Sequence, residues 1–184
     1  MGELPLAICV LLLVSFRLLE WRQLRGNPAA LQGWKTDPSA YLVMVPWALT
    51  IVGSLVEYVG LHRQPTLVGL VIGTLLGVLG VSVRISGLRS LGRHFVVAVQ
   101  VPEDHTLVQE GLYRHLRHPL YLGNLLLMFS LGLVLGVTYT WAAVALGVVG
   151  VVWRIRIEER LLLEKLPGYA EYRSHTAALI PGLW

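Results

Sequence analysis

The sequence predicts an all-α integral membrane protein with about five transmembrane helices and a polar face at one side of the membrane. Three observations lead to this fold class. Of the 184 residues, 55% are hydrophobic and only 14% are charged, whereas soluble domains carry about 25% charged residues. Long apolar stretches separated by polar turns recur along the chain. The basic residues gather at the ends of these stretches, as membrane topology requires.

Composition also limits the classes of function. At this length one domain, residues 1–184, is expected. The single cysteine, Cys9, excludes an internal disulfide and a cysteine-ligated metal centre, and its apolar surroundings predict a packing role. The net charge of +4 does not indicate nucleic acid binding, because topology alone explains where the basic residues lie.

Three apolar stretches form a predicted N-terminal scaffold, residues 1–88. Helices are expected over residues 3–24, 41–61 and 66–88. The first stretch is interpreted as a membrane helix rather than a signal peptide, because no small-residue cleavage site follows it.

Glycines recur at four-residue spacing in the third stretch, at Gly69, Gly73 and Gly77. This spacing places them on one face of a helix, and a glycine face allows a neighbouring helix to approach closely. We therefore expect a helix–helix contact along this face.

The longest uncharged stretch, residues 118–153, has no Asp, Glu, Lys or Arg over 36 positions. One helix of that length would measure roughly 54 Å, whereas the hydrocarbon core of a bilayer is about 30 Å thick. Two spans are therefore expected, over residues 119–137 and 140–165, with a turn at Thr138–Thr140. A Pro-Gly pair ends the second span, and a short interfacial helix is expected over residues 169–173.

The distribution of basic residues predicts the orientation. With five spans, the first loop, the third loop and the C-terminal segment share one side of the membrane. They hold Arg22, Arg25, Lys35, Arg89, Arg93, Arg114, Arg117, Arg154, Arg156, Arg160, Lys165 and Arg173. The opposite side holds only Arg63. The positive-inside rule then places the N-terminus outside and the polar segments in the cytosol.

Two polar clusters fall on this cytosolic side. The first, residues 105–123, contains three histidines, two arginines and two tyrosines, and the second, residues 154–160, reads Arg-Ile-Arg-Ile-Glu-Glu-Arg. Arg154 and Glu158 are four residues apart and so share a helix face. The spacing leaves two interpretations open, an ordinary surface ion pair or part of a functional site.

No metal site is predicted from the histidines. His115 and His118 are three residues apart, but Pro119 disfavours a continuous helix through both. The chain also has no His-Glu-x-x-His motif, no glycine-rich phosphate loop and no Gly-x-Ser-x-Gly nucleophile elbow. From physical reasoning alone, the sequence predicts a five-helix membrane protein with a polar pocket facing the cytosol.

Four segments of the second half resemble a known family pattern. They are His105-Thr-Leu-Val108, Gly111-Leu-Tyr113, Arg117-His-Pro-Leu-Tyr121-Leu-Gly123 and Arg154-x-x-x-Glu158-Glu159. Together they resemble the isoprenylcysteine carboxyl methyltransferase family, part of a membrane methyltransferase superfamily that includes phospholipid N-methyltransferases. The resemblance covers about residues 88–181. It implies a catalytic core over residues 89–184, with a cytosolic cofactor pocket formed by the 89–118 connector and the C-terminal segment.

The resemblance implies S-adenosylmethionine as the methyl donor, with S-adenosylhomocysteine as the product. It implies cofactor contacts from Gln100, His105, Thr106, Leu107, Val108, Tyr113, His118, Pro119, Leu120, Tyr121 and Glu158. It also implies that Arg154 faces the substrate as the catalytic residue. These residue types suit the roles, because a carboxylate can bind the ammonium or ribose hydroxyls of the donor and an arginine can orient a carboxylate acceptor.

The expected function is therefore a membrane methyltransferase that takes its donor from the cytosol and a lipophilic or lipidated acceptor from the bilayer. Carboxyl O-methylation of an isoprenylcysteine-like substrate is the leading expectation. Phospholipid N-methylation and S-methylation of a small thiol remain alternatives, because the sequence does not name the acceptor. A membrane scaffold with a degenerate pocket is the alternative outside the enzymes, and the intact motifs argue against it.

Overall fold

The structure is a computed structural model that describes residues 3–25, 37–92, 95 and 107–182. These residues form helices and no β-strand, so the predicted all-α class is confirmed for them. The long helices are α1 (Glu3–Leu24), α3 (Tyr41–Gly60), α4 (Leu67–Leu91), α5 (Pro119–Leu135) and α6 (Trp141–Lys165). The short ones are the 3₁₀ helices η2 (Pro38–Ala40) and η4 (Gly111–Arg114), and α7 (Tyr169–His175).

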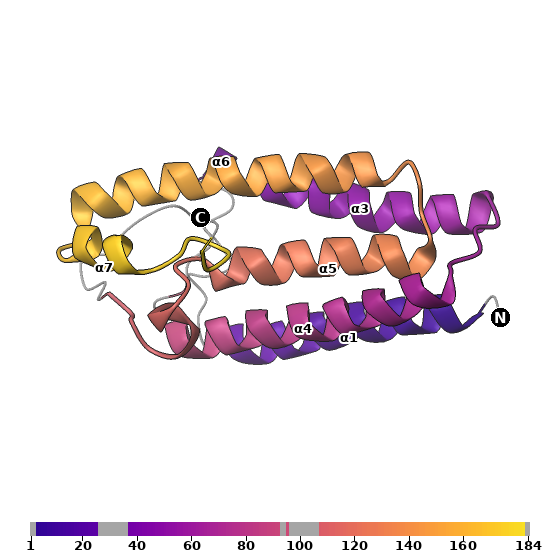
Figure 1. Ribbon diagram of the computed structural model, residues 1–184, viewed down its shortest axis with the longest axis horizontal. Helices are drawn as coiled ribbons and strands as arrows, with labels where there is room; N and C mark the ends of the chain where they lie inside the picture. The colour runs from indigo at the N-terminus through magenta and orange to yellow at the C-terminus, as the bar shows by residue number, and fades with distance from the viewer. Residues whose placement is uncertain (1–2, 26–36, 93–94, 96–106, 183–184) are drawn as a thin grey trace.

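The five long helices lie lengthwise beside one another (Figure 1). In this view α3 and α6 run along one side, α1 and α4 along the other, and α5 lies between them. The last turns of α6, together with η4, α7 and the first turn of α5, gather at the end of the bundle away from the N-terminus. The polar segments of the sequence therefore meet at one end, which we call the polar end.

Three segments are long and apolar enough to cross a membrane, namely Glu3–Leu24, Pro38–Gly60 and Leu67–Leu91. Their outward surfaces are apolar, and Leu11, Val56 and Leu75 are each 65% exposed. Exposed aliphatic faces of this length are suited to lipid rather than to water. The fold thus supports a multi-pass membrane protein.

The observed helices agree with the expected ranges to within three residues. The predicted turn at Thr138–Thr140 is confirmed, since α5 ends at Leu135 and α6 begins at Trp141. One boundary was wrong, because residues 89–91, expected in the connector, belong to α4. That helix ends only at Gly92, whose φ of 51° lies in the left-handed region that glycine tolerates.

The predicted glycine face of α4 packs as expected. A β-carbon on Gly73 would lie 2.8–2.9 Å from atoms of Val134 and Leu133 on α5. One on Gly77 would meet the Ser130 hydroxyl of α5 at 2.6 Å and the side chain of Leu12 on α1. The small residues therefore allow α4 to lie directly against both neighbours.

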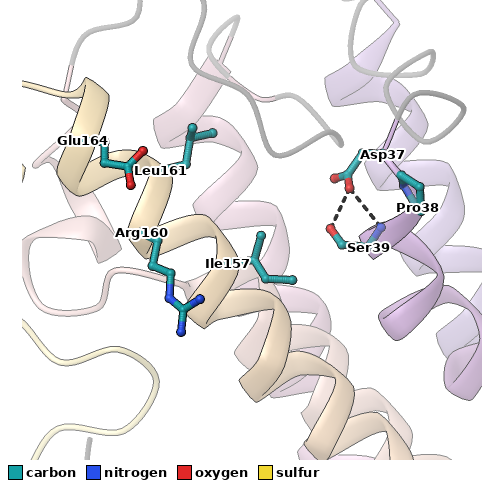
Figure 2. A pocket seen from close by; sticks show the side chains of 7 residues that line it. All are labelled: Asp37, Pro38, Ser39, Ile157, Arg160, Leu161 and Glu164. Carbon is teal, nitrogen blue, oxygen red and sulfur yellow. Dashed lines mark hydrogen bonds between the residues drawn. The ribbon is translucent and has the colours of Figure 1, made fainter.

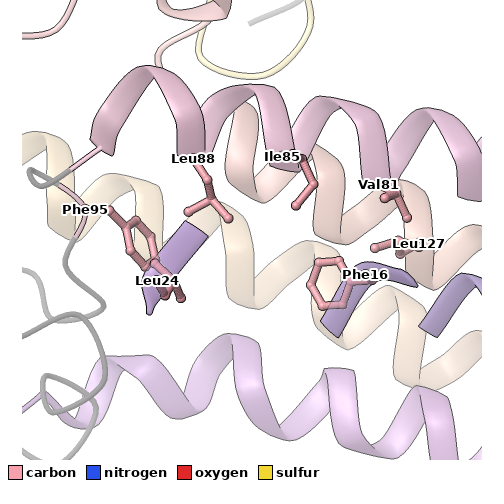
Figure 3. Packing of buried hydrophobic residues seen from close by; sticks show 7 residues of the cluster. All are labelled: Phe16, Leu24, Val81, Ile85, Leu88, Phe95 and Leu127. Carbon is pink, nitrogen blue, oxygen red and sulfur yellow. The ribbon is translucent and has the colours of Figure 1, made fainter. Parts of the chain in front are cut away.

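A buried apolar cluster joins α1, α4 and α5 near the polar end (Figure 3). It consists of Phe16, Leu24, Val81, Ile85, Leu88, Phe95 and Leu127. Beside it Arg84 forms an ion pair with Glu20 of α1, with a nitrogen–oxygen distance of 2.5 Å. Arg84 also donates a 3.2 Å hydrogen bond to the Leu120 carbonyl, which fastens α1 and α4 to the first turn of α5.

At the opposite end, Glu57 of α3 caps the start of α6. Its buried carboxylate accepts hydrogen bonds from the backbone N–H groups of Thr138, Tyr139 and Thr140, and from the Thr140 hydroxyl. Arg63 lies 3.0 Å from the same carboxylate. An anion at a helix N-terminus satisfies backbone donors that have no partner within the helix. The contact fixes the last turn of α3 against the start of α6.

The glycine face gives a direct test of this packing. Gly73→Ala is expected to destabilise the fold by about 1–3 kcal/mol, the usual cost of overpacking, because Leu133 and Val134 must move. Thermal unfolding of the protein in detergent measures the effect. Gly60→Ala is the matched control, because none of the described atoms lies within 4 Å of its added carbon. Equal unfolding midpoints for the two variants would contradict the proposed contact.

Candidate functional site

Arg154 lies at the centre of the polar end and is only 3% exposed. Its Nε donates to the Tyr121 hydroxyl at 2.8 Å, and Nη1 donates to the Ser39 hydroxyl at 2.6 Å. Its Nη2 forms an ion pair with Asp37 at 3.0 Å. A guanidinium can remain buried only when its charge and donors are matched in this way. Arg154 therefore joins the starts of α3 and α5 to α6.

Asp37 and Ser39 reach Arg154 from the start of η2, where Asp37 is the N-cap and Ser39 is a helical residue. The Asp37 Oδ1 accepts hydrogen bonds from the Ser39 N–H at 2.9 Å and from the Ser39 hydroxyl at 2.7 Å (Figure 2). Pro38 occupies the first helical position, as is common after a capping aspartate. Sequence reasoning missed both residues, although Asp-Pro-Ser directly before an apolar run is a capping signal.

Tyr121 links Arg154 to Glu158. Its hydroxyl accepts from Arg154 and donates to the Glu158 Oε2 at 2.9 Å. The two charged residues of α6 are thus bridged by a tyrosine from α5. Arg154 is buried, and it is held by Tyr121 of α5 and by Asp37 and Ser39 at the entry to α3. An ordinary surface ion pair between Arg154 and Glu158 is therefore not what the structure shows. It is a continuous polar chain, Asp37–Arg154–Tyr121–Glu158.

Glu159 has a different environment from its neighbour Glu158. It is 6% exposed and lies against three side chains that can carry positive charge. Arg117 Nε is at 2.7 Å, Arg173 Nε at 3.2 Å and His118 Nε2 at 3.3 Å from its oxygens. Arg117 also donates to the Arg173 and Thr176 carbonyls. Glu159 therefore clamps the Arg-His-Pro segment and the C-terminal segment onto α6.

Backbone contacts complete this clamp. The N–H groups of Arg117 and His118 donate to the carbonyls of Ala177 and Ala178, at 2.8 and 3.0 Å. The Tyr172 hydroxyl donates to the Tyr113 carbonyl at 2.6 Å. Burial raises the pKa of Tyr172 to about 12, so this donor keeps its proton at neutral pH. The C-terminal segment thus fixes η4 and the entry to α5.

The predicted cofactor residues fall into four groups. Gln100, His105 and Thr106 lie outside the described residues. Tyr113, Tyr121 and Glu158 come together, and burial followed by the Glu158 charge raises the pKa of Tyr113. Leu107 packs against Leu166, Tyr169 and Tyr172, and Val108, next to it, is half-buried.

The remaining three residues of the prediction are directed into the protein. The His118 ring faces Glu159. Pro119 is fully buried, and the side chains of Pro119 and Leu120 lie over Gly87 of α4. Here the His118 side chain contacts Glu159, the other two side chains pack against α4, and cofactor contact from any of the three stays a prediction.

Tyr169 carries an unpaired polar group beside these residues. The side chain is 2% exposed, and its hydroxyl has no hydrogen-bond partner among the residues that the structure describes. Burial, and then the Glu159 charge, raise the pKa of Tyr169, so the hydroxyl is a permanent donor at neutral pH. A buried donor without a partner is rare and is suited to a polar ligand. Sequence reasoning did not assign Tyr169 to the site.

A pocket of about 490 Å³ opens between η2 and α6 (Figure 2). It is lined by Asp37, Pro38, Ser39, Ile157, Arg160, Leu161 and Glu164. Two of these residues, Asp37 and Ser39, are the partners of Arg154. The pocket therefore adjoins the polar chain on the α3 side.

Comparisons with known proteins agree with the motif pattern. Residues 71–164 match the model of the isoprenylcysteine carboxyl methyltransferase family. The protein-S-isoprenylcysteine O-methyltransferase of Saccharomyces cerevisiae is 34% identical over 60% of this chain and 48% of its own length. The cobalt-zinc-cadmium resistance protein CzcN of Cupriavidus metallidurans is 40% identical over 59% of this chain and 49% of its own. The chain thus spans about half the length of these two relatives.

A third relative is matched over most of its length. Protein-S-isoprenylcysteine O-methyltransferase A of Arabidopsis thaliana is 30% identical over 78% of this chain and 77% of its own length. The family model covers half of the chain and includes Tyr113, Tyr121, Arg154 and Glu158. With the motifs held together by the contacts described above, the chain belongs to the isoprenylcysteine carboxyl methyltransferase family.

Proposed function

We propose that this protein is an S-adenosylmethionine-dependent membrane methyltransferase that methylates the carboxyl group of an isoprenylcysteine-like acceptor. The observation that carries the proposal is the buried chain from Arg154 through Tyr121 to Glu158. It joins the residue expected to face the acceptor to the residue expected to hold the donor. The names of the yeast and Arabidopsis relatives, both protein-S-isoprenylcysteine O-methyltransferases, support the acceptor class.

The proposed arrangement in the membrane has five spans, formed by α1, α3, α4, α5 and α6. The N-terminus lies outside and the polar end lies in the cytosol. Three of these helices have the length and composition for a span. With 17 residues, α5 is at the lower limit of about 17–25 for a transmembrane helix. The excess of basic residues on the loops at the polar end supports the orientation.

The residues around Glu158 fit the proposed donor. Glu158 offers a half-buried carboxylate for an ammonium group or ribose hydroxyls. The Tyr169 hydroxyl, which has no partner among the described residues, offers a buried donor, and Leu107 offers an apolar contact beside it. A carboxylate, a phenol and an apolar wall match the charged, polar and aromatic parts of S-adenosylmethionine.

Methyl transfer to a carboxylate requires no acid–base catalysis from the protein. When bound, S-adenosylmethionine supplies a sulfonium methyl group, so its transfer to a carboxylate breaks one C–S bond, forms one C–O bond and moves no proton. The residues then have to orient the acceptor and exclude water. Arg154 has the planar donor geometry suited to a carboxylate, and in the structure its three nitrogens contact Tyr121, Ser39 and Asp37. Tyr121 fixes Arg154 relative to Glu158 through a single oxygen.

Binding and transfer test the proposed function together. Purified protein in detergent is expected to bind S-adenosylmethionine in calorimetry, and to transfer a radiolabelled methyl group to N-acetyl-S-farnesylcysteine. Methionine alone, which lacks the adenosine group, is the control ligand. Folded protein that gave neither heat nor thermal shift at millimolar donor would overturn the proposal. Label on phosphatidylethanolamine instead of the carboxylate probe would replace carboxyl methylation with N-methylation.

Substitutions on α6 are expected to separate donor binding from turnover. Glu158→Gln keeps the volume and removes the charge, so donor affinity should fall by about ten- to a hundredfold, as expected for loss of a charged hydrogen bond of roughly 1.5–3 kcal/mol. Arg154→Lys keeps the charge but loses the planar fork. It should leave donor affinity nearly unchanged and strongly reduce methyl transfer. If both substitutions had small and equal effects on donor affinity and on methyl transfer, Arg154 and Glu158 would have only a structural role.

A further inference from the structure

The pocket between η2 and α6 is not used by the proposed donor residues. We propose that this pocket binds the polar end of the methyl acceptor, and that Asp37 and Ser39 position Arg154 towards it. The inference rests on the proposed function and assigns its acceptor site. At about 490 Å³ the pocket falls within the range of about 300–1,000 Å³ that is usual for small-molecule sites.

The geometry of α6 places the pocket on the acceptor side of Arg154. Ile157, Leu161 and Glu164 follow Arg154 by three, seven and ten residues, so the 3.6-residue repeat sets them on adjoining faces. The same repeat puts Glu158 on the other side of Arg154. Arg154 therefore occupies a position on α6 that adjoins both the pocket residues and the proposed donor residue.

The lining of the pocket suits an amphiphilic acceptor. Pro38, Ile157 and Leu161 provide apolar surface, and the side chain of Ile157 extends from α6 towards Ser39 (Figure 2). Arg160 and Glu164 add charged groups, and both are on exposed positions of the helix. An isoprenylcysteine combines a hydrocarbon chain with a carboxylate, and this lining offers contacts for both.

Asp37 and Ser39 hold Arg154 in a closed ring of polar contacts. Arg154 donates to the Ser39 hydroxyl and pairs with the Asp37 Oδ2, while the Ser39 hydroxyl donates to the Asp37 Oδ1. The ion pair is shielded from water, since the side chains of Arg154 and Asp37 are 4% and 15% exposed. The ring therefore fixes the plane of the guanidinium and balances its charge next to two residues of the pocket lining, Asp37 and Ser39.

One pair of variants tests the pocket. Leu161→Trp fills it and should raise the KM for N-acetyl-S-farnesylcysteine by about tenfold, a loss of about 1.4 kcal/mol in binding. The Kd for S-adenosylmethionine should not change. Leu163→Trp is the matched control, because Leu163 lies on the same helix but is exposed and outside the pocket lining. An unchanged acceptor KM in Leu161→Trp would overturn the pocket assignment and leave the proposed function standing.

A second set of variants tests positioning. Asp37→Asn keeps the volume and the oxygen that caps η2, but removes the charge opposite Arg154. It should lower kcat by up to about a hundredfold, as misplaced catalytic groups do, with the Kd for the donor unchanged. Ser39→Ala should also lower kcat, and Ser39→Thr should restore part of it. A capping role alone would change the unfolding midpoint and leave kcat at the wild-type value.

The outcomes separate the two proposals. If the wild-type protein binds the donor but does not methylate the carboxylate probe, both the proposed acceptor and this inference are overturned. If wild-type transfer occurs and Asp37→Asn retains the wild-type kcat, the positioning role is overturned alone. Should Asp37→Asn fail to fold, Ser39→Ala decides, because it keeps the Asp37 charge beside Arg154.

Discussion

The polar end of this protein depends on one buried charge, the guanidinium of Arg154. It lies on α6, and its partners come from the entry to α3 and the first turn of α5, so the three helices must meet where it lies. Removing a partner of a buried ion pair costs roughly 3–5 kcal/mol, because the remaining charge is left without compensation. The contacts that hold the helices together are therefore the same contacts that would orient an acceptor.

The adjacent glutamates on α6 show how one helix serves two purposes. Successive residues of a helix point about 100° apart, so Glu158 and Glu159 face different neighbours. Glu159 is buried among Arg117, His118 and Arg173 and holds the C-terminal segment in place. Glu158 is only half-buried and meets the Tyr121 hydroxyl. The paired motif thus combines a structural clamp with a residue that remains available to a ligand.

Local patterns explain which features the sequence predicts correctly. The glycine face of α4 and the turn before α6 depend on residues only a few positions apart in the sequence, so both could be predicted from it. Contacts between residues far apart in the sequence could not be predicted in this way. Ser39 and Arg154 are 115 positions apart, and no periodicity links them. The contact partner of His118 could not be predicted from the sequence either, because a histidine in a polar motif can face a cofactor or a carboxylate. In the structure its ring faces Glu159.

The central claim is that Arg154 and Tyr121 act as one unit between acceptor and donor. A double-mutant cycle on methyl transfer, with Tyr121→Phe, Arg154→Lys and the double variant, tests it most directly. Tyr121→Phe removes only the hydroxyl that joins Arg154 to Glu158. The account predicts that the double variant is hardly slower than Arg154→Lys alone, since the contact is already broken. Independent effects that add to within about 0.5 kcal/mol would contradict it.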